Sequence, residues 1–83
     1  MKKIIFGENK NIIHENLKLY RIKKGLTQNQ LAAKLQTFNI NIDQQMISKI
    51  EHNNRIVTDY ELLIICRILG VTAEELACGI DEE

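Results

Sequence analysis

Apolar residues recur along this chain at intervals of three and four positions, the spacing that places side chains on one face of an α-helix. Three stripes of this kind stand out: Ile13, Leu17 and Tyr20; Leu31, Ala32 and Leu35; and Ile47 and Ile50. The chain contains no proline, and the strict alternation of apolar and polar residues that marks a half-buried strand is confined to the short stretch 38–43. The pattern therefore predicts an all-α fold.

Start and stop signals divide the pattern into five helices. A Thr followed three residues later by Glu or Gln can satisfy free N–H groups at a helix start. Three such capping boxes occur, at 27–30, 58–61 and 72–75, and Asp43 can begin a further helix. Residues that tolerate positive φ close the helices: Gly25, Asn39, Asn53 and Gly70. We expect short turns between the five helices.

The helix predicted to begin near Thr58 is apolar on two sides. Leu62, Ile65, Cys66 and Leu69 cluster on one side, and Tyr60, Ile64 and Ile68 line nearly the opposite one. We expect the first side to face the core. The second then needs a cover, either the N-terminal segment Ile4–Phe6 or another copy of the protein, unless it is ordinary exposed surface.

The formal charge of this 83-residue chain is zero, but the charge is unevenly distributed. Residues 1–57 carry ten basic and four acidic side chains, whereas residues 58–83 carry Arg67 and seven acidic ones. Such a charge distribution can present a basic surface to a polyanion such as nucleic acid. Two ordinary solvated surfaces explain the same charge distribution equally well. The length predicts one domain.

Composition also narrows the class of protein. No apolar run approaches the roughly 20 residues needed to cross a bilayer. Cys66 and Cys78 fit no metal-ligand spacing, which favours reduced thiols in a cytoplasmic protein. His14 and His52 lie on different predicted helices without a partnered nucleophile, so we do not expect an enzyme. We expect no metal, no cofactor and no small-molecule ligand.

Three segments occur in order, "LTQNQLAAKL", "MISKIE" and "LGVTAEEL". Together they resemble the Cro/phage-repressor type (xenobiotic-response-element-like) helix-turn-helix regulators, over about residues 12–79. The resemblance implies a compact five-helix bundle of the lambda-repressor-like type that binds double-stranded DNA, commonly as a homodimer. The segment "QTFNINID", residues 36–43, is about five residues longer than the corresponding turn in most members. We therefore expect a lengthened turn between the second and third helices.

The resemblance places a recognition helix at about residues 43–52, in the DNA major groove, with Gln44, Gln45 and Lys49 at base-contacting positions. Glutamine can pair with adenine N6 and N7, and lysine can donate to guanine O6 and N7. Taken alone, two glutamines would indicate only a soluble helix start. The resemblance and the position of these residues in the predicted helix favour base reading.

Contacts to the DNA backbone are expected from four other residues: Gln28, Ser48, Asn54 and Arg55. Gln28 begins the second helix, whose N-terminal amides favour an anion. Asn54 and Arg55 follow the recognition helix in a loop that often contacts phosphate in the family. Glu51 is expected to be tied into the fold, because a carboxylate facing phosphate is unfavourable.

The expected organisation is an arm at residues 1–11 that packs on the core or on a dimer partner, the helix-turn-helix domain at 12–79, and an acidic tail at 80–83. Tyr60, Ile64 and Ile68 are expected to form the dimer or arm-packing surface. The alternative function is a protein-binding adaptor or antitoxin-like module built on the same fold. The sequence does not specify the operator, the regulated genes, or repression as opposed to activation.

Overall fold

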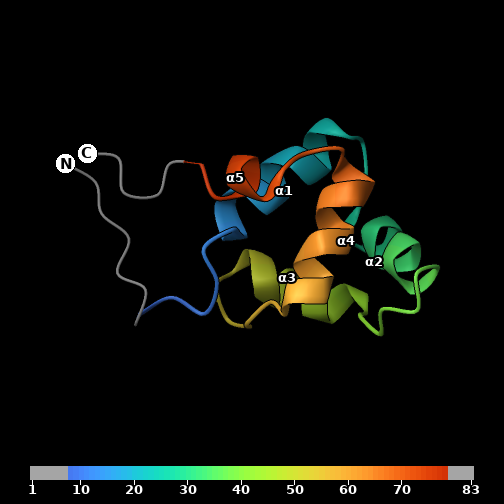
Figure 1. Cartoon of the computed structure of the whole chain (residues 1–83). Helices are drawn as coiled ribbons and strands as arrows, with labels where there is room; N and C mark the ends of the chain where they lie inside the picture. The colour runs from blue at the N-terminus through green and yellow to red at the C-terminus, as the bar shows by residue number, and fades with distance from the viewer. Residues whose placement is uncertain (1–7, 79–83) are drawn as a thin grey trace.

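The computed structural model describes residues 8–78, which fold into five α-helices joined by short turns (Figure 1). The helices are α1 (His14–Lys23), α2 (Gln28–Gln36), α3 (Gln44–Glu51), α4 (Asp59–Leu69) and α5 (Ala73–Leu76). No strand occurs within residues 8–78, and none of the helices there has the length and hydropathy required to cross a membrane. The predicted all-α, five-helix fold is confirmed.

Local chemistry sets the ends of these helices. The side chains of Thr27, Asp43, Thr58 and Thr72 each accept the backbone N–H group three residues later, at the start of α2, α3, α4 and α5. Within residues 8–78, the residues with positive φ are the four expected ones: Gly25, Asn39, Asn53 and Gly70. The predicted start and stop signals are therefore confirmed.

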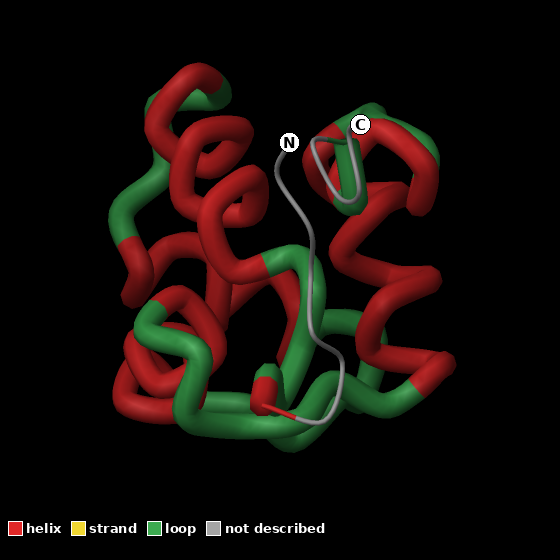
Figure 2. The backbone as a smooth tube through the Cα atoms, turned by 90° about the vertical axis from the view of Figure 1, so that its left-hand side faces the viewer, coloured by secondary structure: helices red, strands yellow, loops and turns green. Residues whose placement is uncertain are grey.

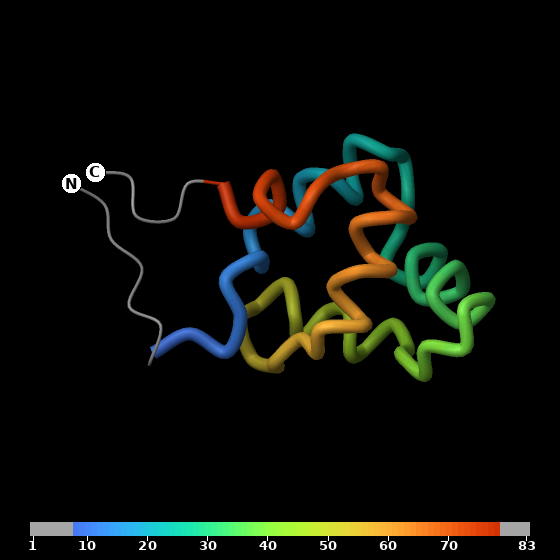
Figure 3. The backbone as a smooth tube through the Cα atoms, viewed as in Figure 1, coloured from blue at the N-terminus to red at the C-terminus, as the bar shows by residue number. Residues whose placement is uncertain are grey.

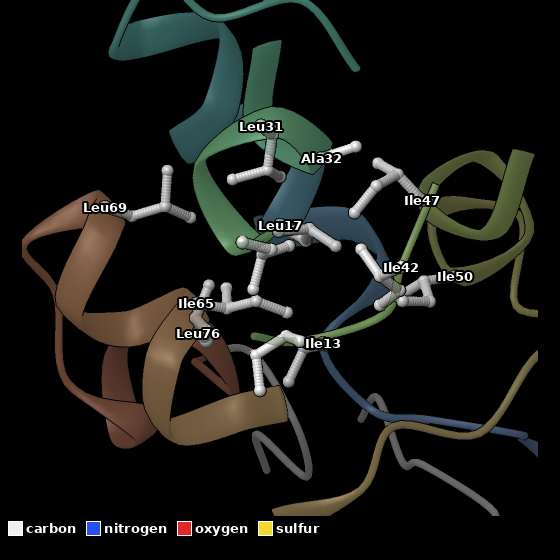
Figure 4. Close-up of a cluster of buried hydrophobic side chains, with 12 residues drawn as sticks. Ile13, Leu17, Leu31, Ala32, Ile42, Ile47, Ile50, Ile65, Leu69 and Leu76 are labelled. Carbon is white, nitrogen blue, oxygen red and sulfur yellow. The ribbon is translucent and has the colours of Figure 1, made fainter. Parts of the chain in front are cut away.

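The core is a cluster of branched aliphatic side chains contributed by all five helices and by the connection between α2 and α3 (Figure 4). Leu17 of α1 lies at the centre of the view, between Leu31 of α2 and Ile65 of α4. All three are fully buried, as are Ile47 and Ile50 of α3. Burial of each such side chain contributes about 1.5–3 kcal/mol to stability, so these contacts fix α3 against the bundle.

The lengthened connection between α2 and α3 is also anchored in the core. After α2 the chain makes one more turn, in which the N–H of Asn39 donates to the Gln36 carbonyl at 3.0 Å and that of Ile40 to the Leu35 carbonyl at 3.2 Å. Ile40 and Ile42 are buried, as predicted. The Gln36 side chain donates to the Ile42 carbonyl at 2.9 Å. Figure 3 shows this connection at the edge of the molecule, between α2 and α3.

The prediction for α4 needs correction. Ile64 and Ile68, expected on an uncovered side, are half-buried and pack against the core cluster. The reason is that the buried line of α4 runs through Glu61, Ile65 and Leu69. Half-buried residues flank this line on both sides, Leu62 and Cys66 of the expected core set and Ile64 and Ile68 of the expected outer set. Tyr60, the third residue of the expected outer side, is exposed. The N-terminal segment Ile4–Phe6 and residues 80–83 lie outside the described part of the chain.

Candidate nucleic-acid interface

The outward face of α3 carries the predicted base-reading residues. Ile47 and Ile50 hold the opposite face in the core, with no exposed surface. Gln45 and Lys49 are exposed one helical turn apart, and Gln44 is half-buried beside them. The structure thus brings the three predicted residues onto one polar surface at the start and middle of a short, firmly anchored helix.

A chain of hydrogen bonds fixes the side chain of Gln44. Glu51 accepts from the Gln28 amide nitrogen at 3.0 Å, and the Gln28 amide oxygen accepts from the Gln44 amide nitrogen at 2.6 Å. A carboxylate only accepts, so Gln28 must direct its NH₂ group to Glu51 and its oxygen to Gln44. Gln44 therefore retains its own amide oxygen and one N–H outside the chain of bonds. We call Arg21, Glu51, Gln28 and Gln44 the amide relay.

The relay begins at a buried ion pair. Arg21 of α1 donates from Nε to Glu51 at 2.6 Å and from a terminal nitrogen to the second carboxylate oxygen at 3.1 Å. A further N–H of Arg21 bonds the Leu26 carbonyl at 2.8 Å. The side chains of Arg21 and Glu51 are 10% and 2% exposed. The predicted structural role of Glu51 is confirmed, and its partner links α1, α2 and α3.

Arg21 was not identified from the sequence, although a signal for it exists. It lies four residues after Leu17, on the buried stripe of α1, and Glu51 lies four residues after Ile47, on the buried face of α3. Two opposite charges at core positions of different helices are expected to form an ion pair, because an unpaired buried charge is strongly unfavourable.

A shallow groove lies where α2 and α3 begin. It is lined by Arg21, Thr27, Gln28, Asn29 and Gln44. The first turn of a helix has backbone N–H groups without helical acceptors, and the positive end of the helix dipole lies there. The groove therefore combines amide donors with the start of α2, which suits an anionic group. Asn29 was not among the predicted residues.

Arg55 has a different environment from the one expected. Both terminal nitrogens donate to the Glu61 carboxylate, at 3.0 and 3.1 Å, and one also bonds the Ile56 carbonyl at 2.9 Å. The hydrogen bond to Glu61 raises the pKa of the guanidinium. Burial alone would raise the pKa of Glu61, but hydrogen bonds from Arg55 and Thr58 outweigh it and leave that pKa below the ordinary value. Arg55 therefore anchors the loop to α4.

This ion pair gives a pH-dependent stability. Because the pKa of Glu61 is lowered on folding, its contribution is present above about pH 4.3, the ordinary value for a glutamate, and is lost as the pH falls through the lower folded value. Glu61→Gln should lower the free energy of unfolding by about 1–2 kcal/mol at pH 7. In urea titrations, the difference from wild type should shrink toward pH 3. Glu74→Gln, at an exposed acid, is the control, and a difference independent of pH would contradict this role.

The loop after α3 is tied to the segment that precedes α1. The Asn53 side-chain oxygen accepts the backbone N–H groups of Lys10 and Asn11, at 2.9 and 3.3 Å. The Asn11 amide in turn donates to the carbonyls of Ile50 and Arg55, both at 3.0 Å. Asn53 thus combines positive φ with side-chain contacts that a glycine could not make.

The remaining predicted backbone contacts lie at the end of α3. Asn54 is exposed, and its N–H closes the helix on the Lys49 carbonyl at 2.8 Å. Ser48 is half-buried, and its hydroxyl lies 3.4 Å from His52 Nδ1. His52 was not predicted as a site residue, yet its exposed ring lies on the outward face of α3, with Nδ1 2.7 Å from the Ser48 carbonyl.

Two consecutive helices joined by a connection packed into the core, the second exposing a polar face, define the class: a helix-turn-helix protein. A family model described as "Helix-turn-helix" matches residues 17–76. The chain belongs to this family of DNA-binding regulators, and the resemblance to the Cro/phage-repressor type is confirmed. The comparison with curated protein sequences gave no match.

A solved structure supports the same fold. The chain is similar to a crystal structure described as a hypothetical transcription factor, NHTF, from Neisseria, with a TM-score of 0.71. The two sequences are 21% identical, and the match covers 93% of this chain and 83% of the other. At this identity the similarity establishes the arrangement of helices.

Proposed function

We propose that this protein is a transcription regulator that binds double-stranded DNA in a sequence-specific manner, with α3 in the major groove. The amide relay is the observation that supports this proposal most strongly. It joins the first residue of α2 to the first residue of α3 and holds the Gln44 amide in one orientation. A helix-turn-helix reads bases from the N-terminal part of its second helix, where this amide lies.

The relay favours adenine as the base read by Gln44. Adenine offers a donor at N6 and an acceptor at N7, which match the amide oxygen and the remaining N–H of Gln44. Gln45 can make the same type of contact, and Lys49 can donate to guanine O6 and N7. These three side chains are the proposed readers. Each well-aligned bidentate pair discriminates against a wrong base by about 1–3 kcal/mol.

The proposed backbone contacts surround these readers. The Gln28 amide and the first turn of α2 border the groove, where a phosphate would meet N–H donors. Ser48 and the exposed Asn54 add polar groups along and after α3. Arg55 contributes by holding the loop in place through Glu61. The excess of basic residues in the first two thirds of the chain supplies long-range attraction to DNA.

We further propose that the protein acts in the cytoplasm as a homodimer and is not an enzyme, requiring no cofactor or small-molecule ligand. Two copies related by a two-fold axis would place their α3 helices in half-sites about one helical turn of DNA apart.

The salt dependence of DNA binding tests this function. If phosphates are neutralised, the logarithm of the binding constant for a duplex pool should fall linearly with the logarithm of salt concentration, with a slope of several units. Fluorescence anisotropy between 50 and 200 mM salt, roughly the range over which such losses are large, gives this slope. A slope near zero, or no binding at low salt, would contradict the proposal and favour the protein-binding adaptor.

A further inference from the structure

The outward face of α4 is exposed and has both apolar and charged residues. Tyr60 and Leu63 are 58% and 61% exposed, and Ile56, just before the helix, is 62% exposed. Asp59 and Arg67 are exposed at the two ends of the same face. Figures 1 and 2 show α4 along one outer side of the molecule. None of these residues belongs to the amide relay or to the outward face of α3.

The charges on this face are arranged symmetrically about Leu63. Asp59 precedes Leu63 by four residues and Arg67 follows it by four, which places each about 6 Å from it along the axis. Four-residue spacing also keeps all three side chains on one side of the helix. Within residues 8–78, neither Asp59 nor Arg67 takes part in an ion pair. The face therefore offers one cationic and one anionic end around an apolar centre.

We propose that this face binds a second copy of the chain, with the two α4 helices antiparallel and Leu63 on the two-fold axis. A two-fold interface must be complementary to itself. In the antiparallel arrangement, Asp59 of each copy meets Arg67 of the other, whereas a parallel pair would bring like charges together. Tyr60 then packs near the aliphatic stem of the second copy's Arg67, and Leu63 packs on Leu63.

The expected dimer is weak. One pair of eleven-residue helices buries less than the roughly 800 Å² per partner of a standard interface. The dissociation constant of the dimer should therefore be on the order of micromolar or higher. Self-association is measured without DNA, so the outcome does not depend on whether the proposed DNA-binding function is correct.

Charge reversal tests the antiparallel arrangement by sedimentation equilibrium of the full chain. Asp59→Arg and Arg67→Asp should each weaken the homodimer at least tenfold, because each variant opposes like charges at both ends. An equimolar mixture of the two variants should form heterodimers about as tightly as wild type, because every contact then joins Arg to Asp. No recovery in the mixture, or a wild-type chain that stays monomeric at millimolar concentration, would overturn the proposal.

Matched substitutions at two exposed leucines distinguish an interface on α4 from one on α1. Leu63→Glu should abolish the dimer, whereas Leu19→Glu, at an equally exposed leucine of α1, should leave it intact. Both leucines are more than 60% exposed, so both variants should retain the wild-type melting temperature at dilute, monomeric concentration. Loss of the dimer in Leu19→Glu but not in Leu63→Glu would also overturn the proposal and assign the interface to α1.

Discussion

Replacing Glu51 with alanine is expected to lower the free energy of unfolding by about 3–5 kcal/mol, because it leaves the Arg21 guanidinium buried without its partner. The total stability of a domain is about 5–15 kcal/mol, and a small one lies toward the lower end. Glu51→Ala should therefore be partly or largely unfolded at 37 °C. Urea denaturation followed by circular dichroism measures the loss.

The double variant Arg21→Met, Glu51→Leu is the control for this prediction. It removes both charges and fills the space with apolar groups, so most of the stability should return. Gln28 would still lose the carboxylate that orients it, and base preference should weaken in a folded protein. A Glu51→Ala variant within about 1 kcal/mol of wild type would contradict the buried pair as a major source of stability.

Gln44→Ala should weaken binding to the preferred duplex by about 1–3 kcal/mol, through loss of a bidentate base contact. Gln28→Ala should also weaken binding, partly because the Gln44 amide is then free to rotate. Part of the Gln28 effect acts through Gln44. The loss of binding free energy in the double variant should therefore be smaller than the sum of the two single losses, by about 0.5–3 kcal/mol. Fluorescence anisotropy with labelled duplex measures all four affinities of the cycle.

Gln45 provides the matched control for this cycle. It is exposed beside Gln44 but makes no hydrogen bond to Gln28 in the relay. Gln28→Ala and Gln45→Ala should therefore have additive effects on binding. Equal coupling in both cycles would show that Gln28 does not act through Gln44 in particular.

The features of the fold that depend on neighbouring residues were predictable from the sequence. A Thr and the Gln or Glu three residues later satisfy each other's backbone groups wherever they occur, so helix starts such as Thr27 and Thr58 followed directly. Positive φ at Asn39 and Asn53 was also predictable locally, because asparagine tolerates the left-handed conformation. The return of Ile42 to the core also followed, because the apolar pattern resumed before α3.

The features that depend on contacts between distant segments could not be predicted from the sequence in the same way. Periodicity gives the angle between side chains on α4 but does not show which side of the helix faces the core. Glu61, the acidic residue at the start of the buried line, was not expected to be buried. Arg55 was assigned by its position in a family pattern, whereas its contacts depend on Glu61, six residues later. The amide relay spans three helices, so its orientation of Gln44 required their relative positions.

Selection of bound duplexes from a random pool, with wild type and Gln44→Ala in parallel, tests the central claim most directly. Wild type should enrich a defined motif that contains adenine at the position read by Gln44. The variant should retain the rest of the motif and lose its preference at that position. An identical motif from both proteins, or no enrichment by wild type, would contradict base reading by Gln44 at the start of α3.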